Sequence, residues 1–168
     1  MQHILARRSI RKYTAEPVCD DHIRKLLECA MAAPSAHNQQ PWHFLVVRER
    51  ELLDEVPKFH PYSSMLKQAP LAILVCGEEA LAKTKPFWVQ DCSAATQNIL
   101  IGAQSLGLGA VWLGVYPAQP LVTGMRELFG IPEQITPFAM VAIGHPAEQK
   151  PPANRYNEQR VHYDRWRC

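Results

Sequence analysis

The segment from Ala33 to Phe44 carries the densest set of side chains that could bind a ligand. It reads A-P-S-A-H-N-Q-Q-P-W-H-F, so Pro34 and Pro41 enclose a run of neutral hydrogen-bond donors and acceptors. Because proline interrupts helices and sheets, this run is predicted to be a loop. Hydroxyl, imidazole and amide groups crowded on a loop suit a planar, neutral ligand edged with heteroatoms. A polar connector that only turns the chain is the alternative, because loops are polar in general.

A second candidate site lies close to the N-terminus, where residues 7 to 13 read R-R-S-I-R-K-Y. Four of the six side chains from position 7 to position 12 are cationic, and they repel one another unless an anion is near. Guanidinium groups favour phosphate, because the planar fork can bind two oxygens at once. The segment therefore predicts an anion site. A solvated basic arm is the alternative, whereas Glu16, Asp20 and Asp21 argue against a targeting presequence.

The composition places the chain among ordinary globular proteins. Its 168 residues suffice for one domain, residues 1 to 168, with 47% hydrophobic and 20% charged side chains. A formal net charge of +2 is too small for a general nucleic-acid or membrane-surface binder. No run of apolar residues approaches the length needed to span a bilayer, and the N-terminal residues do not have the pattern of a signal peptide. We expect a cytoplasmic protein with neither nucleic acid nor membrane as its partner.

The cysteines predict neither a disulfide framework nor a metal site. The five cysteines include no C-x-x-C pair and leave an odd one over. Cys29 and Cys92 fall in helical patterns and Cys76 ends an apolar run, so we expect small buried side chains in a reducing compartment. The sequence also contains no H-E-x-x-H, G-x-S-x-G or phosphate-loop motif, and no dinucleotide-binding glycine pattern. His43 is interpreted as a strand residue with a satisfied ring.

The elements that must position these side chains alternate between helices and strands. From Asp20 the apolar residues recur at helical spacing until Pro34 ends the pattern. Short apolar runs rich in β-branched and aromatic residues predict strands, several of them buried on both faces. The predicted strands are 42–47, 71–76, 109–116 and 138–143, and the further helices are 51–56, 64–69 with Ser63 as its cap, 87–106 and 121–129.

Two glycines and the end of the chain attract notice within this pattern. Gly102 in the longest predicted helix would permit a close crossing with another helix, either in the core or at a subunit interface. Gly114 interrupts a strand, which often marks a bulge or the close approach of a ligand to backbone. Residues 147–160 are polar without periodicity, but Tyr163 and Trp166 follow, so we expect the tail to pack on something, such as a second subunit.

Five segments, taken in order, resemble the nitroreductase-like flavoproteins, and together they run through nearly the whole chain. They are R-R-S-I-R-K-Y at 7–13, A-P-S-A-H-N-Q-Q-P-W-H-F at 33–44, W-V-Q-D-C-S-A-A-T-Q-N-I-L at 88–100, L-G-L-G-A-V-W-L-G-V-Y-P at 106–117 and the closing H-Y-D-R-W. The resemblance implies an α+β fold with a mixed, mainly antiparallel β-sheet flanked by helices. It also implies an intertwined homodimer with one FMN at each of two subunit interfaces.

Carried over residue by residue, the resemblance gives a set of FMN-binding residues and no metal ligand. One group would bind the phosphate and ribityl chain, and Arg11 would lie near the pyrimidine edge, where its charge would stabilise the reduced ring. A loop would contact the isoalloxazine, with Pro34 and Ser35 reaching the partner's flavin, and a strand would bring a backbone N–H to N5. Longer members often carry an acidic residue at the position of Gly114, so only its backbone is given a role. The residues are Arg7, Arg8, Ser9 and Arg155 for the phosphate, Pro34, Ser35, Asn38 and Gln40 for the loop, and Leu113 and Gly114 for the strand.

The function implied is that of an FMN-dependent NAD(P)H oxidoreductase. NADH or NADPH would pass hydride to flavin N5 and leave, and the reduced flavin would then reduce a nitroaromatic, quinone or related acceptor in a ping-pong order. FMN would perform the chemistry, and no side chain is expected to act as an acid or base. The chain is short for this family, which favours an exposed flavin and broad acceptance.

Two other interpretations remain open from the sequence. A reductive dehalogenase or flavin-fragmenting enzyme shares this fold, although the lid that such enzymes carry is not evident here. A non-catalytic flavin-binding or regulatory dimer would need nearly the same residues as an enzyme. Reduction of the bound flavin by a nicotinamide cofactor separates these possibilities.

Overall fold

The computed structural model describes residues 1–166. Its centre is a four-stranded sheet in the order β1-β2-β4-β3, in which every strand pairing is antiparallel. One isolated parallel bridge, between Ser9 and Ala110, adds the N-terminal segment at the outer edge of β3. The predicted α+β class with a mainly antiparallel sheet is confirmed. The strands are β1 (Trp42–Val47), β2 (Leu71–Glu78), β3 (Gly109–Gly114) and β4 (Ile135–Gly144).

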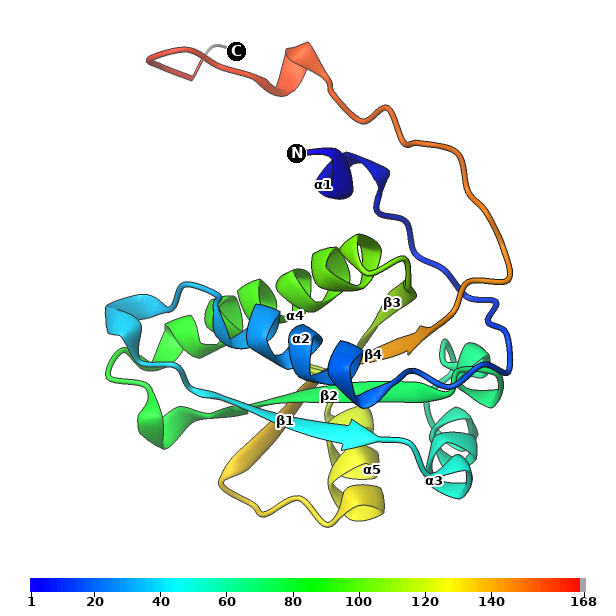
Figure 1. Ribbon diagram of the computed structural model, residues 1–168. Helices are drawn as coiled ribbons and strands as arrows, with labels where there is room; N and C mark the ends of the chain where they lie inside the picture. The colour runs from blue at the N-terminus through cyan, green and yellow to red at the C-terminus, as the bar shows by residue number, and fades with distance from the viewer. Residues whose placement is uncertain (167–168) are drawn as a thin grey trace.

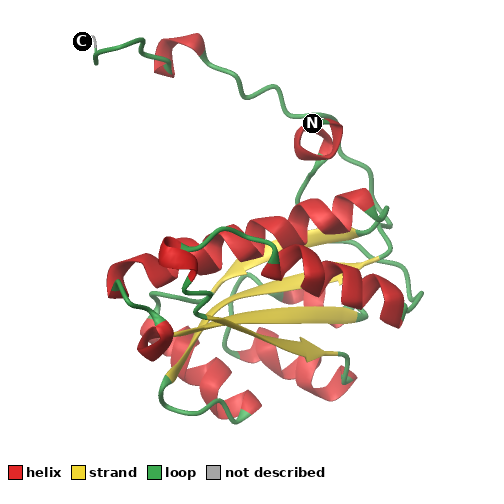
Figure 2. Cartoon of the chain, turned by 60° about the vertical axis from the view of Figure 1, so that its left-hand side comes forward, coloured by secondary structure: helices red, strands yellow, loops and turns green. Residues whose placement is uncertain are grey.

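Helices cover both faces of the sheet (Figure 1). Successive residues of a strand point to opposite faces, so Ile73 packs on one side of the sheet and Leu74 on the other. Two helices pack against the first face and two against the second, and Figure 2 shows the sheet between these layers. Burial on both faces explains why the β2 sequence is a continuous apolar run. The first face is covered by α2 (Asp20–Met31) and α4 (Trp88–Ser105), the second by α3 (Arg50–Glu55) and α5 (Gln119–Phe129), and a short α1 (Gln2–Ala6) contacts α4.

The crossing of α2 and α4 is close, as the glycine in α4 predicts. A Cβ atom added at Gly102 would lie 3.1 Å from Sγ of Cys29, tighter than ordinary packing allows. Asn98 of α4 also donates a hydrogen bond of 2.9 Å to the Cys29 carbonyl. A side chain at position 102 would therefore require Cys29 to shift by a few tenths of an ångström. Whether α4 also forms a subunit interface stays a prediction.

Two details of the predicted elements were wrong. Ser63 does not cap a helix, because its hydroxyl donates to the His60 carbonyl at 2.8 Å and only a 3-10 turn, Ser64–Lys67, follows. The predicted strand 109–116 ends at Gly114, because the N–H groups of Val115 and Tyr116 both donate to the Phe138 carbonyl. This irregularity, a local bulge, ends the ladder beside an exposed glycine.

Two of the cysteines are buried as expected. Cys76 and Cys92 are buried and Cys29 is partly buried, whereas Cys19 is exposed and Cys168 lies outside the described residues. Burial raises the pKa of Cys76 to about 12 and also raises the pKa of Cys92, so both thiols stay protonated at neutral pH. Within residues 1–166 no group of three or more His, Cys, Asp or Glu could hold a metal ion. None of the helices described is long and apolar enough to cross a membrane.

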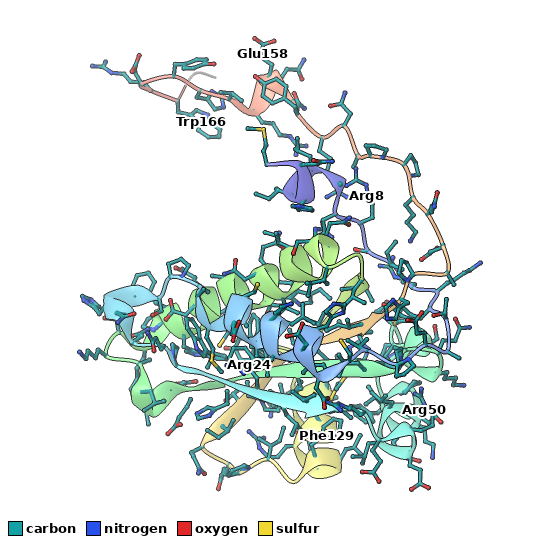
Figure 3. The ribbon with its side chains drawn as sticks, in the orientation of Figure 1. Arg8, Arg24, Arg50, Phe129, Glu158 and Trp166 are labelled. Atoms are coloured by element: carbon teal, nitrogen blue, oxygen red, sulfur yellow. The ribbon has the colours of Figure 1, made fainter. Side chains whose placement is uncertain are left out.

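After β4 the chain leaves the sheet and runs past α1, as the orange and red segment of Figure 1 shows. Figure 3 places Glu158 and Trp166 on this segment, well away from the sheet. The side chains of Tyr163 and Trp166 are 72% and 79% exposed. The expectation that this tail packs on something is not met within the described part of the chain, so packing on a second subunit stays a prediction.

Candidate active site

The cationic segment near the N-terminus lies along the outer edge of β3. Its Ile10 N–H donates to the Ala110 carbonyl at 3.1 Å, next to the bridge between Ser9 and Ala110. The segment after β4 joins it, because Nζ of Lys150 donates to the Ser9 carbonyl at 2.6 Å. Backbone pairing thus brings both ends of the chain to the same edge of the sheet.

Two of the predicted phosphate ligands, from opposite ends of the sequence, come together. Arg7 and Arg155 line a small pocket of about 230 Å³. The pKa of Arg7 is lowered from its usual value, first by burial and then by the charges of Arg155 and Arg8. Among the described residues no carboxylate pairs with these three arginines, whereas Arg24 and Arg48 elsewhere each pair with one. An uncompensated cluster of this kind fits an anion.

Arg8 differs from its neighbours because most of its donors are already used. Nε donates to the Pro151 carbonyl at 2.8 Å, and Nη1 donates to the carbonyls of Leu5, at 2.9 Å, and Arg7. Arg8 therefore links the segment after β4 to the N-terminal segment, and Figure 3 shows Arg8 between the two. Its Nη2 is buried and has no partner within residues 1–166. A buried donor without a partner is costly, so this atom too fits an added acceptor.

Further along the same edge, a cleft of about 610 Å³ lies beside the end of β3. Arg11, Leu113 and Gly114, all predicted flavin contacts, line it. The Arg11 backbone N–H donates to Oε1 of Glu148 at 2.5 Å, and this bond is the largest cause of the lowered pKa of that carboxyl. Because Glu148 binds the backbone, the Arg11 guanidinium remains without an ion pair in the described part of the chain.

The backbone of Gly114 faces the cleft. Successive carbonyls of β3 point alternately toward β4 and toward the outer edge of the sheet. The Ala110 carbonyl accepts the Ile10 N–H and the Gly114 carbonyl contacts Nε2 of His60, so both point outward. The same alternation directs the Gly114 N–H outward, while Leu113 is paired with Met140. An added Cβ at Gly114 would find nothing within 4 Å. Of the two predicted strand residues, therefore, Gly114 has the N–H that a ligand in the cleft could reach.

His60, which sequence reasoning did not select, lies at the same cleft. Its ring is buried, with 2% of the residue exposed, and Nε2 is 2.9 Å from the Gly114 carbonyl. Nδ1 accepts the N–H of Tyr62 at 3.3 Å. His60 lies in an irregular segment between two short turns, so no periodic pattern points to it. The sequence signal for this residue was an ionisable side chain between Phe59 and Pro61.

The other predicted group, the loop that includes Pro34, Ser35, Asn38 and Gln40, lies beside the N-terminal end of α4. Asp91 of α4 holds it there by accepting hydrogen bonds from the Ala36 N–H at 2.9 Å and from Nε2 of Gln39 at 2.6 Å. Sequence reasoning missed Asp91, although a carboxylate on an otherwise apolar helix was a usable signal. No hydrogen bond or ion pair within residues 1–166 joins this loop to the arginines or to Gly114.

The backbone of the loop is strained. His37, Asn38 and Gln40 have φ angles of 52°, 52° and 47°, which residues other than glycine rarely adopt. Internal bonds hold this shape, because Ser35 Oγ accepts the Gln40 N–H at 3.0 Å and Asn38 Oδ1 accepts from the Gln40 amide at 2.9 Å. Strained residues that the surroundings hold in place often mark binding sites. Asn38 and Gln40 remain exposed and available to a ligand.

Comparison with known proteins identifies relatives for the whole chain. The sequence model of the Nitroreductase family matches residues 4–60 and 54–145. A protein of Methanothermobacter thermautotrophicus, provisionally named an NADH dehydrogenase/NAD(P)H nitroreductase, is 50% identical over 99% of this chain and 87% of its own length.

Solved structures agree with this assignment. A Clostridium acetobutylicum protein provisionally named an NADH oxidase has a TM-score of 0.95 at 41% identity, with 98% of this chain and 99% of the other covered. A provisional nitroreductase of Desulfovibrio desulfuricans, solved in complex with FMN, has a TM-score of 0.84 at 32% identity, with 99% and 96% covered. The family match together with these similarities shows that the chain belongs to the nitroreductase family and has its fold.

Proposed function

We propose that this protein is an FMN-dependent NAD(P)H oxidoreductase that acts as a homodimer on nitroaromatic, quinone or related acceptors. The observation that carries the proposal is the pocket that Arg7 and Arg155 form from both ends of the chain, with no carboxylate partner among the described residues, together with the cleft that Arg11 and Gly114 line. The solved relative that contains FMN, 32% identical over 99% of this chain, supports the choice of cofactor.

The arginine pocket would hold the phosphate of FMN. Arg7 and Arg155 would contribute charged donors, and the unpartnered Nη2 of Arg8 could donate a further hydrogen bond. Ser9 would bind the ribityl chain or phosphate through its hydroxyl, because its carbonyl is already bound by Lys150. Charge-assisted bonds of this type stabilise a complex by about 1.5–3 kcal/mol each. Retention of FMN would therefore depend mainly on this pocket.

The cleft beside β3 would receive the isoalloxazine ring. Its volume of about 610 Å³ is in the range of small-molecule sites, and the missing side chain at Gly114 leaves the backbone approachable. The Gly114 N–H would donate to the ring at N5, and Leu113 would form part of the apolar wall. Arg11 would place an unpaired positive charge near the edge that becomes electron-rich on reduction.

The loop would complete the site of the other subunit in the dimer. Pro34 and Ser35, with the exposed Asn38 and Gln40, would contact the partner's flavin, since within residues 1–166 no hydrogen bond or ion pair joins the loop to the arginine pocket or the cleft. The exposed aromatic side chains of the tail would become buried against the partner. The site would then need both subunits to be complete.

FMN, once bound, would supply the redox chemistry by accepting hydride from NADH or NADPH and then reducing the second substrate, in ping-pong order. The protein would bind, orient and polarise the ring. The ionisable side chains that line the cleft are those of Arg11, His60 and Tyr62, and none of them is assigned an acid or base role because FMN would supply the chemistry. The protein would act in the cytoplasm, the compartment that its free cysteines favour.

The proposal is tested by purifying the protein and examining it for bound flavin. We expect a yellow dimer that releases FMN on denaturation, whose flavin NADH or NADPH bleaches without oxygen and a nitroaromatic or quinone reoxidises. Flavin that binds but is not reduced by either nicotinamide would indicate a carrier rather than an enzyme. A colourless protein that does not bind added FMN would refute the proposal.

A further inference from the structure

The cationic segment near the N-terminus and the segment after β4 run side by side in antiparallel order (Figure 1). The Thr14 N–H donates to the His145 carbonyl at 2.9 Å. The Ala147 N–H donates to the Lys12 carbonyl, also at 2.9 Å, and an isolated antiparallel bridge lies between these two bonds. This register places the residues before Lys12 opposite the residues after Ala147.

Beyond this backbone pairing, two side chains of the segment after β4 bind the cationic segment. Oε1 of Glu148 accepts the Arg11 N–H at 2.5 Å. Nζ of Lys150 donates to the Ser9 carbonyl at 2.6 Å. The two side chains also form an ion pair, the Glu148/Lys150 pair, with 3.3 Å between Nζ and Oε1. The Lys150 side chain is 32% exposed and that of Glu148 is 19% exposed, so salt screens this pair less than it screens a fully exposed one.

Lys150 holds the peptide group that joins Ser9 to Ile10. The carbonyl of this group accepts from Nζ of Lys150, and its N–H donates to the Ala110 carbonyl at 3.1 Å. One side of the peptide group is therefore bound to β3 and the other side to the segment after β4.

Glu148 holds the next peptide group, which joins Ile10 to Arg11. The N–H of this group donates to Glu148, and its carbonyl accepts from the buried Tyr13 hydroxyl at 2.6 Å. The Arg11 N–H is the largest cause of the lowered pKa of the Glu148 carboxyl, and Lys150 lowers it further. The carboxyl is therefore ionised at neutral pH, the form that accepts hydrogen bonds most strongly.

Together the two bonds fix the points at which the side chains of Ser9 and Arg11 leave the backbone. A peptide group is planar and includes the Cα atoms at both of its ends, so two held groups in succession fix three Cα atoms. The middle one belongs to Ile10, whose side chain is buried in the core. The outer two belong to Ser9 and Arg11, and Arg11 lines the cleft beside β3.

We propose that Glu148 and Lys150 are positioning residues that hold the backbone from Ser9 to Arg11 in the geometry needed to bind FMN. The inference rests on the proposed function, because it takes FMN as the ligand of Ser9 and Arg11. Neither Glu148 nor Lys150 is assigned a contact with the flavin. Their contribution is a segment that is ordered before the cofactor arrives, so that binding requires little further ordering.

Two variants separate the backbone bonds from the charge of the pair. Glu148→Gln keeps an oxygen that can accept the Arg11 N–H but removes the ion pair. Glu148→Lys combined with Lys150→Glu keeps an ion pair and the net charge but loses both backbone bonds, because an ammonium group cannot accept from an N–H and a carboxylate cannot donate to a carbonyl. At position 150 alone, Lys150→Arg keeps the charge and the donor, whereas Lys150→Met removes both.

The matched control reverses a different ion pair. Arg24→Glu combined with Glu28→Arg exchanges the charges of a pair on α2 whose atoms are 3.0 Å apart and whose side chains are 81% and 61% exposed. This variant should bind FMN as the wild type does. All variants are compared by calorimetric titration with FMN at a temperature at which thermal unfolding shows the flavin-free protein to be folded.

We expect FMN affinity to follow the backbone bonds rather than the ion pair. The reversed Glu148/Lys150 pair and Lys150→Met should each raise the Kd for FMN by about tenfold, the effect of one misplaced hydrogen bond. Glu148→Gln and the conservative Lys150→Arg should stay within a few-fold of the wild type. Equal affinities in Glu148→Gln and the reversed pair would overturn the inference, and so would weaker binding by Glu148→Gln than by the reversed pair.

Measurements on the flavin-free protein keep this test separate from the proposed function. The Arg11 amide should exchange with solvent at least about tenfold faster in the reversed pair than in Glu148→Gln, and the Ile10 amide should exchange faster in Lys150→Met than in Lys150→Arg. Equal exchange in either comparison would refute the positioning role whether or not FMN binds. The expected exchange in a protein that binds no FMN would refute the proposed function and, with it, FMN as the ligand for which Ser9 and Arg11 are positioned.

Discussion

Replacing Arg7 with alanine should weaken FMN binding while leaving the flavin-free protein as stable as before, or more stable. In the free protein Arg7 has no carboxylate partner among the described residues, and its lowered pKa records burial and the repulsion of Arg155 and Arg8. A cation whose folded-state pKa is depressed destabilises the fold while it is charged, which for arginine is at every ordinary pH. Its removal should therefore stabilise the flavin-free protein by up to about 1 kcal/mol, a small value because the side chain is only partly buried and solvent screens its charge.

The effect on FMN should have the opposite sign. Loss of one charge-assisted hydrogen bond costs about 1.5–3 kcal/mol, which corresponds to an increase of about 10- to 100-fold in Kd. At an FMN concentration of about 100 Kd the wild type gains about 2.7 kcal/mol of stability, whereas a Kd weakened 100-fold would reduce this gain to about 0.4 kcal/mol. For a chain of this size the corresponding rise in melting temperature falls from about 8 °C to about 1 °C.

The assay is thermal unfolding with and without FMN, together with calorimetric titration. Arg24→Ala is the matched control, because Arg24 lies on α2 away from the pocket (Figure 3) and pairs with Glu28 at 3.0 Å. That variant should lose a few tenths of a kcal/mol and bind FMN as the wild type does. If Arg7→Ala destabilises the flavin-free protein and leaves the Kd unchanged, the pocket is a structural feature and the phosphate assignment fails.

Substitutions at three further positions test the rest of the site. Arg11→Ala should leave FMN bound but lower its midpoint potential, because the unpaired cation no longer stabilises the reduced ring; an unaltered potential would remove this role. Gly114→Ala should be nearly silent in stability and FMN content, because open space surrounds the added methyl, whereas Gly114→Pro removes the N–H and should slow flavin reduction by at least about tenfold. Asp91→Ala should lower stability by about 1–3 kcal/mol and increase proteolysis of the loop, because it leaves the Ala36 N–H and the Gln39 amide without their acceptor; unchanged loop cleavage would show that other bonds hold the loop.

Sequence patterns predicted the framework because burial dictates it. β2 is covered on both faces and therefore reads as one apolar run, and α2 shows the spacing of a helix with one buried side. The ends of elements were harder to predict. β3 stops where two N–H groups share the Phe138 carbonyl, and backbone pairing of that kind leaves no trace in side-chain pattern.

The site could be predicted only in part for the same reason. The charge of the cationic segment predicts a bound anion. Arg7 and Arg8 cannot be told apart in the sequence, however, and the structure shows that Arg8 donates most of its N–H groups to backbone carbonyls. His60 was missed because its partners are backbone groups, which every residue has, whereas Asp91 was missed although its charge on α4 was a usable signal. A side chain that acts through the backbone cannot be recognised from the residue types around it.

The distribution of charge explains why the arginine pocket is better understood as a binding site than as part of the fold. Arginines that support the structure have their charge balanced or their donors used: Arg50, for example, binds the Ala69 carbonyl at 3.0 Å and Asp54 at 3.2 Å. Arg7 and Arg155 have no such partner among the described residues, and the charge of Arg155 adds to burial in lowering the pKa of Arg7. The bridge between Ser9 and Ala110 holds the N-terminal segment, and the Arg8 bond to the Pro151 carbonyl holds the tail beside it. These contacts keep like charges close together, and a bound anion would relieve their repulsion. The flavin phosphate would supply that anion, so binding of the cofactor would also lock the tail that the proposed dimer needs.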